Sequence, residues 1–177
     1  MLHRKDTLAQ TRADFAWDIP DRYNIGVDVC DRVAALTPDA PAIIDQDVTS
    51  FSDLKAMSNR IANTLAPTVS AGDRVAVLLP QSVETAATHI AILKMGAIAI
   101  PLFTLFGPEA LRHRLRDSGT VAVVTNAESA AVLADLRQDL PDLKRILSVD
   151  GASPLADGLH DAMANATERP QSLNEYL

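Results

Sequence analysis

The amino-acid sequence predicts an α/β fold, with a central, mostly parallel sheet flanked by helices. Three short apolar runs carry this prediction: RVAVLL at residues 74–79, AIAIPL at 97–102 and TVAVVT at 120–125. Each run is followed by a segment with helical character, and strands that alternate with helices at this pitch form parallel crossover units. Because the runs contain few polar residues, we expect strands that are buried on both faces of the sheet.

The helices between these strands have recognisable start and end signals. SVETAATHIAILKMG is predicted to be a helix that opens at Ser82 and is closed by Gly96, which can adopt the left-handed conformation. A second helix is predicted within residues 107–119, with proline at its first position and glycine after its end. A third helix is predicted at 127–140, and KRILSVDG at 144–151 is the last expected strand.

The region before the first apolar run has a less regular pattern. Asn24 is the expected N-cap of a helix at residues 25–37. The segment PAIIDQDVTSF at 41–51 indicates two short strands around an Asp-Gln-Asp turn. Ser52 is the expected N-cap of the next helix, DLKAMSNRIANTLA at 53–66.

The pattern divides the chain into an N-terminal arm at residues 1–23, an α/β domain at 24–150 and a partly ordered tail at 151–177. The arm is polar and lacks sustained periodicity. Four of its side chains are expected to lie across a face of the core: Phe15, Trp17, Ile19 and Tyr23. The tail is expected to hold one short helix around 159–164 and to end in a flexible segment at 168–177.

Composition and charge exclude several classes of protein. Hydrophobic residues make up 47% of the 177 residues and charged residues 22%, as in a globular protein. The formal net charge is -7, whereas a nucleic-acid surface needs clustered Lys and Arg, so no nucleic-acid partner is expected. Cys30 is the single cysteine, which excludes an intrachain disulfide and favours a cytoplasmic location.

The apolar stretch AILKMGAIAIPLFTLFGPEAL at residues 91–111 is not predicted to span a membrane. A spanning helix needs about 20 apolar residues, and Lys94, Gly96 and Pro101 interrupt this one early. The start of the chain also lacks the apolar core of a signal peptide. We interpret the stretch as a helix end, a doubly buried strand and the loop FTLFG at 103–107. Ligands of open parallel sheets bind outside the carboxyl ends of strands, so this loop is a candidate ligand contact.

No motif in the sequence marks a catalytic centre or a metal site. There is no Walker-type phosphate loop, no G-x-G-x-x-G between a strand and a helix, no G-x-S-x-G and no paired Cys or His at zinc-binding spacing. Cys30 is expected to be a buried small hydrophobe and His89 a structural histidine. His113 lies in RHRLR at 112–116, which is expected to be a solvated helix face able to touch an anion.

Two blocks of the sequence resemble the N-terminal part of acyl-CoA synthetases, in the adenylate-forming (AMP-binding) superfamily. The first is TSFSDLKAMSNRIANTL at residues 49–65. The second spans 72–125 and is centred on the pattern L-K-x-G-A-x-x-x-P-L, which begins at Leu93. The upstream segment FAWDIPDRYNIGVDVCDRVA also resembles acetyl- and medium-chain acyl-CoA synthetases of bacteria.

The resemblance implies a ligase that activates a small carboxylic acid with ATP and Mg²⁺ and then transfers the acyl group to coenzyme A. It also implies that this chain is an N-terminal fragment, because the family's T-S-G-T-T-G-x-P-K-G loop and the lysine of its C-terminal domain are absent from the 177 residues. The fragment is therefore expected to be inactive alone and to bind none of these cofactors tightly. No residue of the chain is assigned a catalytic role.

In related synthetases the loop after the L-K-x-G-A-x-x-x-P strand comes close to coenzyme A. The resemblance therefore makes Thr104 and Leu105 candidate cofactor-binding residues, mainly through their backbone groups. The alternative, that they only shape the loop, stays open. Two arginines that contact coenzyme A in some acetyl-CoA synthetases are matched by alanines in NAESAAVLADLR, and Arg137 falls about one turn later.

Two further interpretations of the chain stay open at this point. The chain could be a stand-alone α/β ligand-binding or interaction module without catalysis, or a folded remnant without function. A homodimer through an exposed apolar edge is also expected, since a fragment that lacks neighbouring strands exposes such an edge.

Overall fold

A computed structural model describes residues 5–17 and 20–169. Its centre is a sheet of five parallel strands in the order β4-β3-β5-β6-β7. The strands are β3 (Arg74–Leu78), β4 (Ile98–Pro101), β5 (Ala122–Thr125), β6 (Arg145–Ser148) and β7 (Asp157–Gly158). This arrangement confirms the predicted α/β fold with a parallel sheet.

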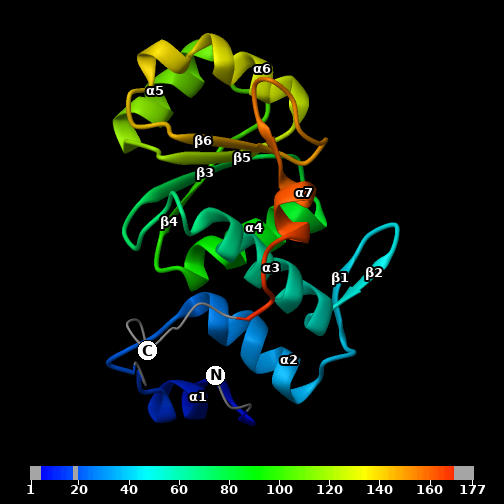
Figure 1. The fold of residues 1–177 in the computed structure, drawn as a ribbon. Helices are drawn as coiled ribbons and strands as arrows, with labels where there is room; N and C mark the ends of the chain where they lie inside the picture. The colour runs from blue at the N-terminus through cyan, green and yellow to red at the C-terminus, as the bar shows by residue number, and fades with distance from the viewer. Residues whose placement is uncertain (1–4, 18–19, 170–177) are drawn as a thin grey trace.

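Helices cover both faces of the sheet (Figure 1). One face packs against α3 (Phe51–Leu65), α4 (Val83–Lys94) and α7 (Leu159–Ala164), and the other packs against α5 (Pro108–Ser118) and α6 (Ala127–Asp135). Successive strand residues alternate between the two cores, so Val75 and Val77 face the first group and Ala76 and Leu78 the second. The central strands β3 and β5 are buried on both faces, as predicted.

Strand β4 differs from the prediction of a doubly buried strand. It lies at the edge of the sheet, and among the described residues its one strand partner is β3. Ile98 is 49% exposed, and Ala99 and Ile100 are half-buried. The prediction was wrong because an edge strand lacks a neighbour on one side, and its apolar run gives no indication of strand order.

The remaining elements lie before the sheet or between its strands. They are α1 (Leu8–Asp14), a π-helix at Val27–Asp31, α2 (Arg32–Leu36), the antiparallel pair β1 (Pro41–Ile44) and β2 (Val48–Ser50), and a short 3₁₀ helix at Arg137–Asp139. The hairpin of β1 and β2 projects from the body of the molecule (Figure 1). It confirms the two short strands around the Asp-Gln-Asp turn. None of the helices in residues 5–17 and 20–169 is long and apolar enough to cross a membrane.

The helix boundaries agree with most of the sequence signals. Asn24 accepts from the Val27 amide, Ser82 caps α4, Pro108 begins α5, and Gly119 follows its end with φ 59°. The predicted N-cap Ser52 was wrong. Ser50 caps α3 instead, because its hydroxyl accepts from the Asp53 amide while the Asp53 carboxylate accepts from the Ser50 amide.

The N-terminal arm contains the helix α1, which the sequence pattern did not predict. Its sequence LAQTRAD has no apolar stripe at helical spacing, and none of its residues is buried. The expected packing of the arm across the core was wrong for Phe15, Trp17 and Tyr23, which are exposed, Trp17 by 80%. Phe15 and Trp17 instead contact each other edge to face at 5.0 Å between ring centroids. Ile19 and residues 170–177 lie outside the described residues.

A buried lysine joins three helical segments beneath the sheet. Lys94, at the end of α4, is 5% exposed. Its Nζ donates to Asp31 Oδ1 (2.6 Å) in the π-helix and to Ser58 Oγ and Asn59 Oδ1 (both 2.8 Å) in α3. All three ammonium protons therefore have an acceptor, which is the condition for burying this charge. Lys94, which interrupts the apolar run in the sequence, thus links α4 to the π-helix and to α3 through hydrogen bonds.

Candidate functional site

The candidate ligand-binding surface is formed by the loops at the carboxyl ends of β3, β4, β5 and β6. The connection after β3 leads to α4 on one face of the sheet, whereas those after β4 and β5 lead to α5 and α6 on the opposite face (Figure 1). Neighbouring loops therefore diverge at the end of β3. In open α/β sheets a crevice at such a point is the usual place for a ligand.

The loop after β4 contains both predicted contact residues. Its start is fixed by the Leu102 amide, which donates to the Val77 carbonyl oxygen at 2.9 Å. Thr104 and Leu105 form the exposed turn of this loop, and the Leu105 side chain is 81% exposed. Their position at the carboxyl edge agrees with the loop geometry expected from the sequence.

An aromatic pair and an arginine stiffen the same loop. The Phe106 amide donates to the Phe103 carbonyl oxygen at 3.0 Å, and the two rings meet edge to face at 6.0 Å. The Arg114 guanidinium of α5 lies 4.4 Å from the centroid of the Phe106 ring, within range of a cation–π interaction. Phe106 therefore anchors the loop to α5 and leaves Phe103 61% exposed.

The helix that follows this loop begins without a side-chain cap. The side-chain oxygens of Ser82 and Asn126 accept hydrogen bonds from backbone amides in the first turns of α4 and α6. The N···O distances are 3.2 and 2.9 Å. Gly107, at the start of α5, has no side chain to do so. Pro108 has no N–H, so the Glu109 and Ala110 amides are the first of α5. They have no side-chain cap, and they lie a few positions after Thr104 and Leu105 in the chain. Free amides at a helix start favour an acceptor or an anion through hydrogen bonding and the helix dipole.

The other polar groups along this edge make structural hydrogen bonds. Thr85 Oγ1 donates to the Pro80 carbonyl oxygen at 2.6 Å, and Thr125 Oγ1 donates to the Leu78 carbonyl oxygen at 3.0 Å. Asp150 Oδ2 accepts from the Ala127 amide at 2.8 Å. Within residues 5–17 and 20–169, no group of three or more His, Cys, Asp or Glu side chains is placed to hold a metal ion. The hydroxyl groups of Thr85 and Thr125 and the Asp150 carboxylate are thus used in holding the loops and helix starts together.

The single cysteine and the central histidine have the structural roles that the sequence suggested. Cys30 is fully buried in the π-helix, and burial raises the pKa of its thiol, with a smaller opposing effect from the Lys94 charge. His89 Nδ1 lies 2.8 Å from the Thr85 carbonyl oxygen, one turn earlier in α4. Neither side chain belongs to the carboxyl-edge surface.

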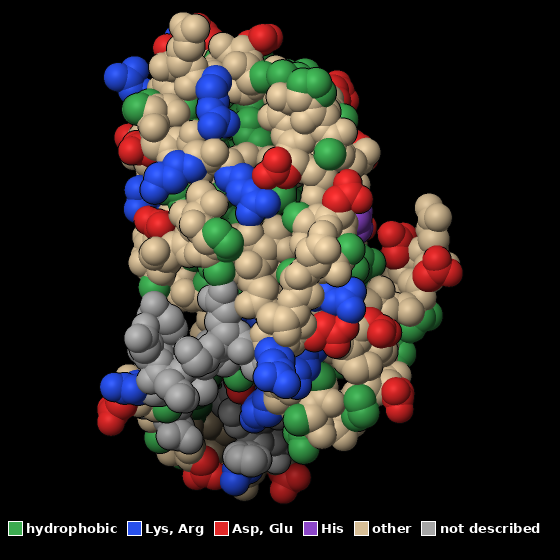
Figure 2. Space-filling view, in the orientation of Figure 1, with side chains coloured by type: hydrophobic (Ala, Val, Ile, Leu, Met, Phe, Trp, Pro, Cys, Tyr) green, Lys and Arg blue, Asp and Glu red, His purple; other side chains and the backbone are tan. Residues whose placement is uncertain are grey.

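The four basic residues of RHRLR are exposed on α5, as predicted, whereas its Leu115 is buried in the core. A shallow hollow there is lined by Glu109, Arg112, His113, Arg116 and Asp117. Two carboxylates therefore accompany the cations. Figure 2 likewise shows Lys and Arg side chains interspersed with Asp and Glu over the face that it draws, a pattern unlike the basic field of a nucleic-acid surface.

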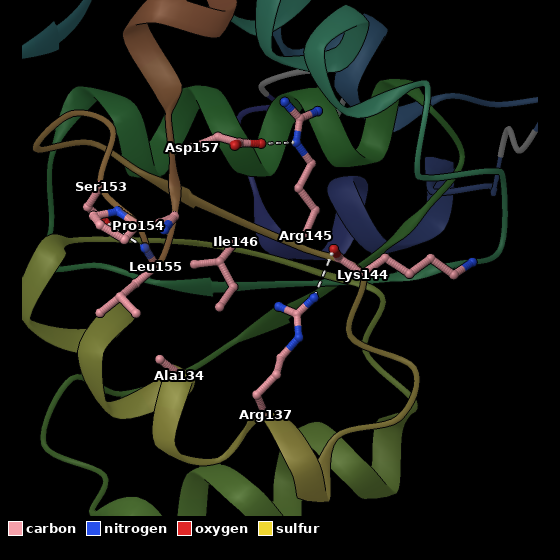
Figure 3. A pocket seen from close by; sticks show the side chains of 10 residues that line it. Ala134, Arg137, Lys144, Arg145, Ile146, Ser153, Pro154, Leu155 and Asp157 are labelled. Carbon is pink, nitrogen blue, oxygen red and sulfur yellow. Dashed lines mark hydrogen bonds and ion pairs between the residues drawn. The ribbon is translucent and has the colours of Figure 1, made fainter.

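A second hollow, of about 380 Å³, lies beside β6. Its lining includes Arg137, the arginine that falls about one turn after the positions of the coenzyme A-contacting arginines of some acetyl-CoA synthetases. Its cations point in different directions (Figure 3). Arg145 pairs with Asp157 at 2.9 Å, and Arg137 donates to the Lys144 carbonyl oxygen at 3.1 Å on the opposite side of the strand. Because these guanidinium groups do not converge, the hollow is not an arginine cluster for an anion.

Comparison with known proteins identifies the family. The sequence model described as "AMP-binding enzyme" matches residues 30–175, most of the chain. The chain therefore belongs to the AMP-binding enzyme family, as the two sequence blocks indicated.

Individual relatives are ligases of coenzyme A. The long-chain-fatty-acid–CoA ligase FadD13 of Mycobacterium tuberculosis is 33% identical over 117 residues, covering 66% of this chain and 23% of the relative. The long-chain-fatty-acid–CoA ligase of Escherichia coli O157:H7 is 32% identical over 134 residues, 73% of this chain and 24% of the relative. Acetyl-coenzyme A synthetase 2 of Zygosaccharomyces bailii is 33% identical over 120 residues, 63% of this chain and 18% of the relative. The chain thus spans about a quarter or less of these proteins.

Solved structures show the same architecture. An acyl-CoA synthetase of Brucella canis superposes with a TM-score of 0.74 at 32% identity, covering 92% of this chain and 31% of that one. The N-terminal domain of FACL13 from M. tuberculosis gives a TM-score of 0.76 at 25% identity, covering 85% and 38%. The anthranilate CoA ligase AuaEII has a TM-score of 0.80 at 24% identity, covering 85% and 30%, which supports the fold alone.

The sequence pattern predicts the loop at 103–107 with Gly107 as its last residue, but this prediction does not include the missing side-chain cap of α5. The signal was available, because Ser82 and Asn126 begin the neighbouring helices whereas glycine and proline begin this one.

Proposed function

We propose that this chain is the N-terminal portion of an ATP-dependent acyl-CoA synthetase. In the parent reaction a small carboxylate attacks the α-phosphorus of ATP, giving an acyl adenylate and releasing pyrophosphate. The thiol of coenzyme A then displaces AMP and forms the thioester. The observation that carries the proposal is the family match over residues 30–175, together with relatives that are CoA ligases.

The chemistry requires parts that the described residues do not supply. Adenylation needs phosphate-binding amides and a cation to neutralise charge, Mg²⁺ in the parent enzyme. The 177 residues contain no glycine-rich phosphate loop, and the described residues offer no metal-binding cluster. We therefore assign no step with ATP or Mg²⁺ to this chain, and we infer that it is inactive alone and binds neither tightly.

The part that we assign to this chain is one wall of the coenzyme A approach. The exposed turn at Thr104 and Leu105 lies beside the uncapped start of α5, so backbone amides are available for polar or phosphate oxygens of a ligand. The contact of the Phe106 ring with the Arg114 guanidinium attaches the loop to α5. A cytoplasmic location follows from the same proposal and fits the single, buried cysteine.

Two measurements test the activity. We expect the chain alone to show no ATP–pyrophosphate exchange dependent on short or medium-chain acids, and turnover by the chain would refute its inactivity. The DNA that follows the codon for Leu177 is expected to encode a TSGTTG-like block in one reading frame. A polypeptide extended through that block and through the C-terminal domain that carries the family's lysine should catalyse the exchange, and an inactive extended protein would contradict the parent function.

The coenzyme A contact is tested with a capping variant. An aspartate at Gly107 fits sterically, because nothing lies within 4 Å of a Cβ at this position. Gly107→Asp should cap α5 and repel an anionic ligand, so it should weaken coenzyme A binding to the extended protein. Gly107→Ala, which adds a methyl group without charge, is the matched control. If both variants and the unsubstituted extended protein bind coenzyme A with equal affinity, the proposed contact between coenzyme A and the start of α5 is contradicted.

The alternative of a stand-alone binding module predicts tight binding by the chain itself. A thermal shift with millimolar coenzyme A, ATP or short acids would support it, whereas no shift favours the fragment proposal. We also propose a homodimer through the β4 edge, since β4 is an edge strand and its Ile98 is exposed. A monodisperse monomer at high concentration in a sizing experiment would contradict the dimer.

A further inference from the structure

Side chains of α3 hold the backbone that follows α7. Asn63 Nδ2 donates to the carbonyl oxygens of the first and last residues of the segment 167–169, at 2.7 and 2.9 Å. Asn59 Nδ2 donates to the carbonyl oxygen of its middle residue at 2.9 Å. Three successive carbonyl groups are thus held by two side chains that lie four residues apart on one side of the helix.

The hydrogen bonds from the two asparagines go to backbone atoms, and one ion pair adds a side-chain contact. Arg60 Nη2 of α3 pairs with the Glu168 carboxylate. Both side chains of this pair are partly exposed, so the pair contributes little by itself. The closure of the segment 167–169 on α3 therefore depends mainly on the asparagine amides.

The orientation of the Asn59 amide is fixed by the buried lysine. Asn59 is nearly fully buried, and its Oδ1 accepts from Lys94 Nζ at 2.8 Å. An ammonium group can only donate, so the amide oxygen must face Lys94 and the amide NH₂ group must face the other way. On that side lies the carbonyl oxygen of Glu168. The same lysine is held by Asp31 of the π-helix at 2.6 Å.

We propose that residues 167–169 form a strap that closes over α3, with Asn59 and Asn63 as its latch and Lys94 as the group that orients Asn59. A continuous hydrogen-bonded path then runs from the π-helix, through Asp31, Lys94 and Asn59, to the strap. Because the strap contacts α3 through a few hydrogen bonds, it opens locally while the sheet stays folded. The inference does not depend on the proposed function.

Proteolysis by Glu-C tests the strap directly. This protease cleaves after glutamate, and the scissile carbonyl of Glu168 is the one that Asn59 holds. Asn63→Ala removes two hydrogen bonds, so we expect cleavage after Glu168, identified by fragment mass, to become about tenfold faster. Asn59→Asp keeps an acceptor for Lys94 but loses the donor, and it should accelerate this cleavage to a similar extent.

The matched control is Asn165→Ala. Asn165 follows the last residue of α7 and precedes the strap, and it donates to the Asp161 carbonyl oxygen of α7 at 3.2 Å, so Asn165→Ala should leave the cleavage rate of the unsubstituted chain unchanged. If Asn63→Ala or Asn59→Asp is cleaved after Glu168 at the rate of the unsubstituted chain, the proposal is overturned. Equal acceleration at Glu84, Glu109 and Glu128 would also overturn it, because global unfolding would then account for the cleavage.

Discussion

Replacing Lys94 by methionine is the sharpest test of how this fold is held together. The Nζ atom of Lys94 is the shared donor for Asp31, Ser58 and Asn59, which belong to the π-helix and to α3. Methionine has a similar length and fills much of the same space, so the substitution removes the charge and the three donors with little change of volume. We expect Lys94→Met to lower the free energy of unfolding substantially.

The magnitude follows from the burial of the pair. Lys94 and Asp31 side chains are 5% and 13% exposed. Removing one partner of a buried ion pair costs about 3–5 kcal/mol, because the other charge stays buried without compensation. The Asn59 oxygen also loses its donor, which adds about 1–3 kcal/mol. The combined loss is comparable with the whole stability of an ordinary domain, about 5–15 kcal/mol.

Urea denaturation monitored by far-ultraviolet circular dichroism measures this loss through the transition midpoint, provided that the slope is unchanged. The double variant Lys94→Met with Asp31→Leu should recover part of the stability, since apolar side chains often replace a buried ion pair without loss. A decrease below about 1 kcal/mol in Lys94→Met would refute the reasoning from burial. A double variant no more stable than the single one would refute the role assigned to Asp31.

Three other predictions concern the cap, the turns and the thiol. Gly119→Ala should lower the unfolding free energy by about 2–3 kcal/mol, because φ is 59° and the new Cβ would displace the Arg74 guanidinium from the Ser118 and Gly119 carbonyl oxygens. Gly72→Ala, with φ 81° and open space, should cost about 1–2 kcal/mol. Equal losses in the two variants would contradict the argument from Arg74. Ser50→Ala should cost about 1 kcal/mol by urea denaturation, as expected for an N-cap, and an unchanged midpoint would contradict the assignment. Burial raises the pKa of the Cys30 thiol. The stability that the protonated thiol contributes is therefore present below its ordinary pKa of about 8.5 and is lost as the pH rises through the folded-state pKa. A thiol reagent should react with Cys30 only in denaturant, and fast reaction of the native protein at neutral pH would contradict its burial.

Local signals in the sequence were sufficient for the core elements of the fold. Pro108 and Gly119 bracket α5, and Ser82 begins α4, because these residues act through backbone geometry and hydrogen bonds within a few positions. The cap of α3 was misplaced by two residues between Ser50 and Ser52. The spacing of Ser50 and Asp53 fits a reciprocal capping box and could have resolved this choice.

The candidate site was only partly predictable. The position of the loop at 103–107 is predictable, because a loop after a parallel strand must lie at the carboxyl edge. The choice of Thr104 and Leu105 within it rests on the resemblance to acyl-CoA synthetases. The anchoring of Phe106 by Arg114 could not be foreseen, since it depends on how α5 packs back toward the loop. The strap on α3 was equally hidden, because Asn59 lies more than 100 positions before its partner in the sequence.

The sequence by itself determined the alternation of strands and helices, the family and the absence of a phosphate loop within these 177 residues, because apolar runs, caps and motifs are local patterns. Only the tertiary structure decided that β4 is an edge strand and that Lys94 is buried. Strand order and the solvation of a charge depend on which distant segments meet. Lys94 interrupts an apolar run in the sequence, and three acceptors from two other segments make its burial favourable in the fold.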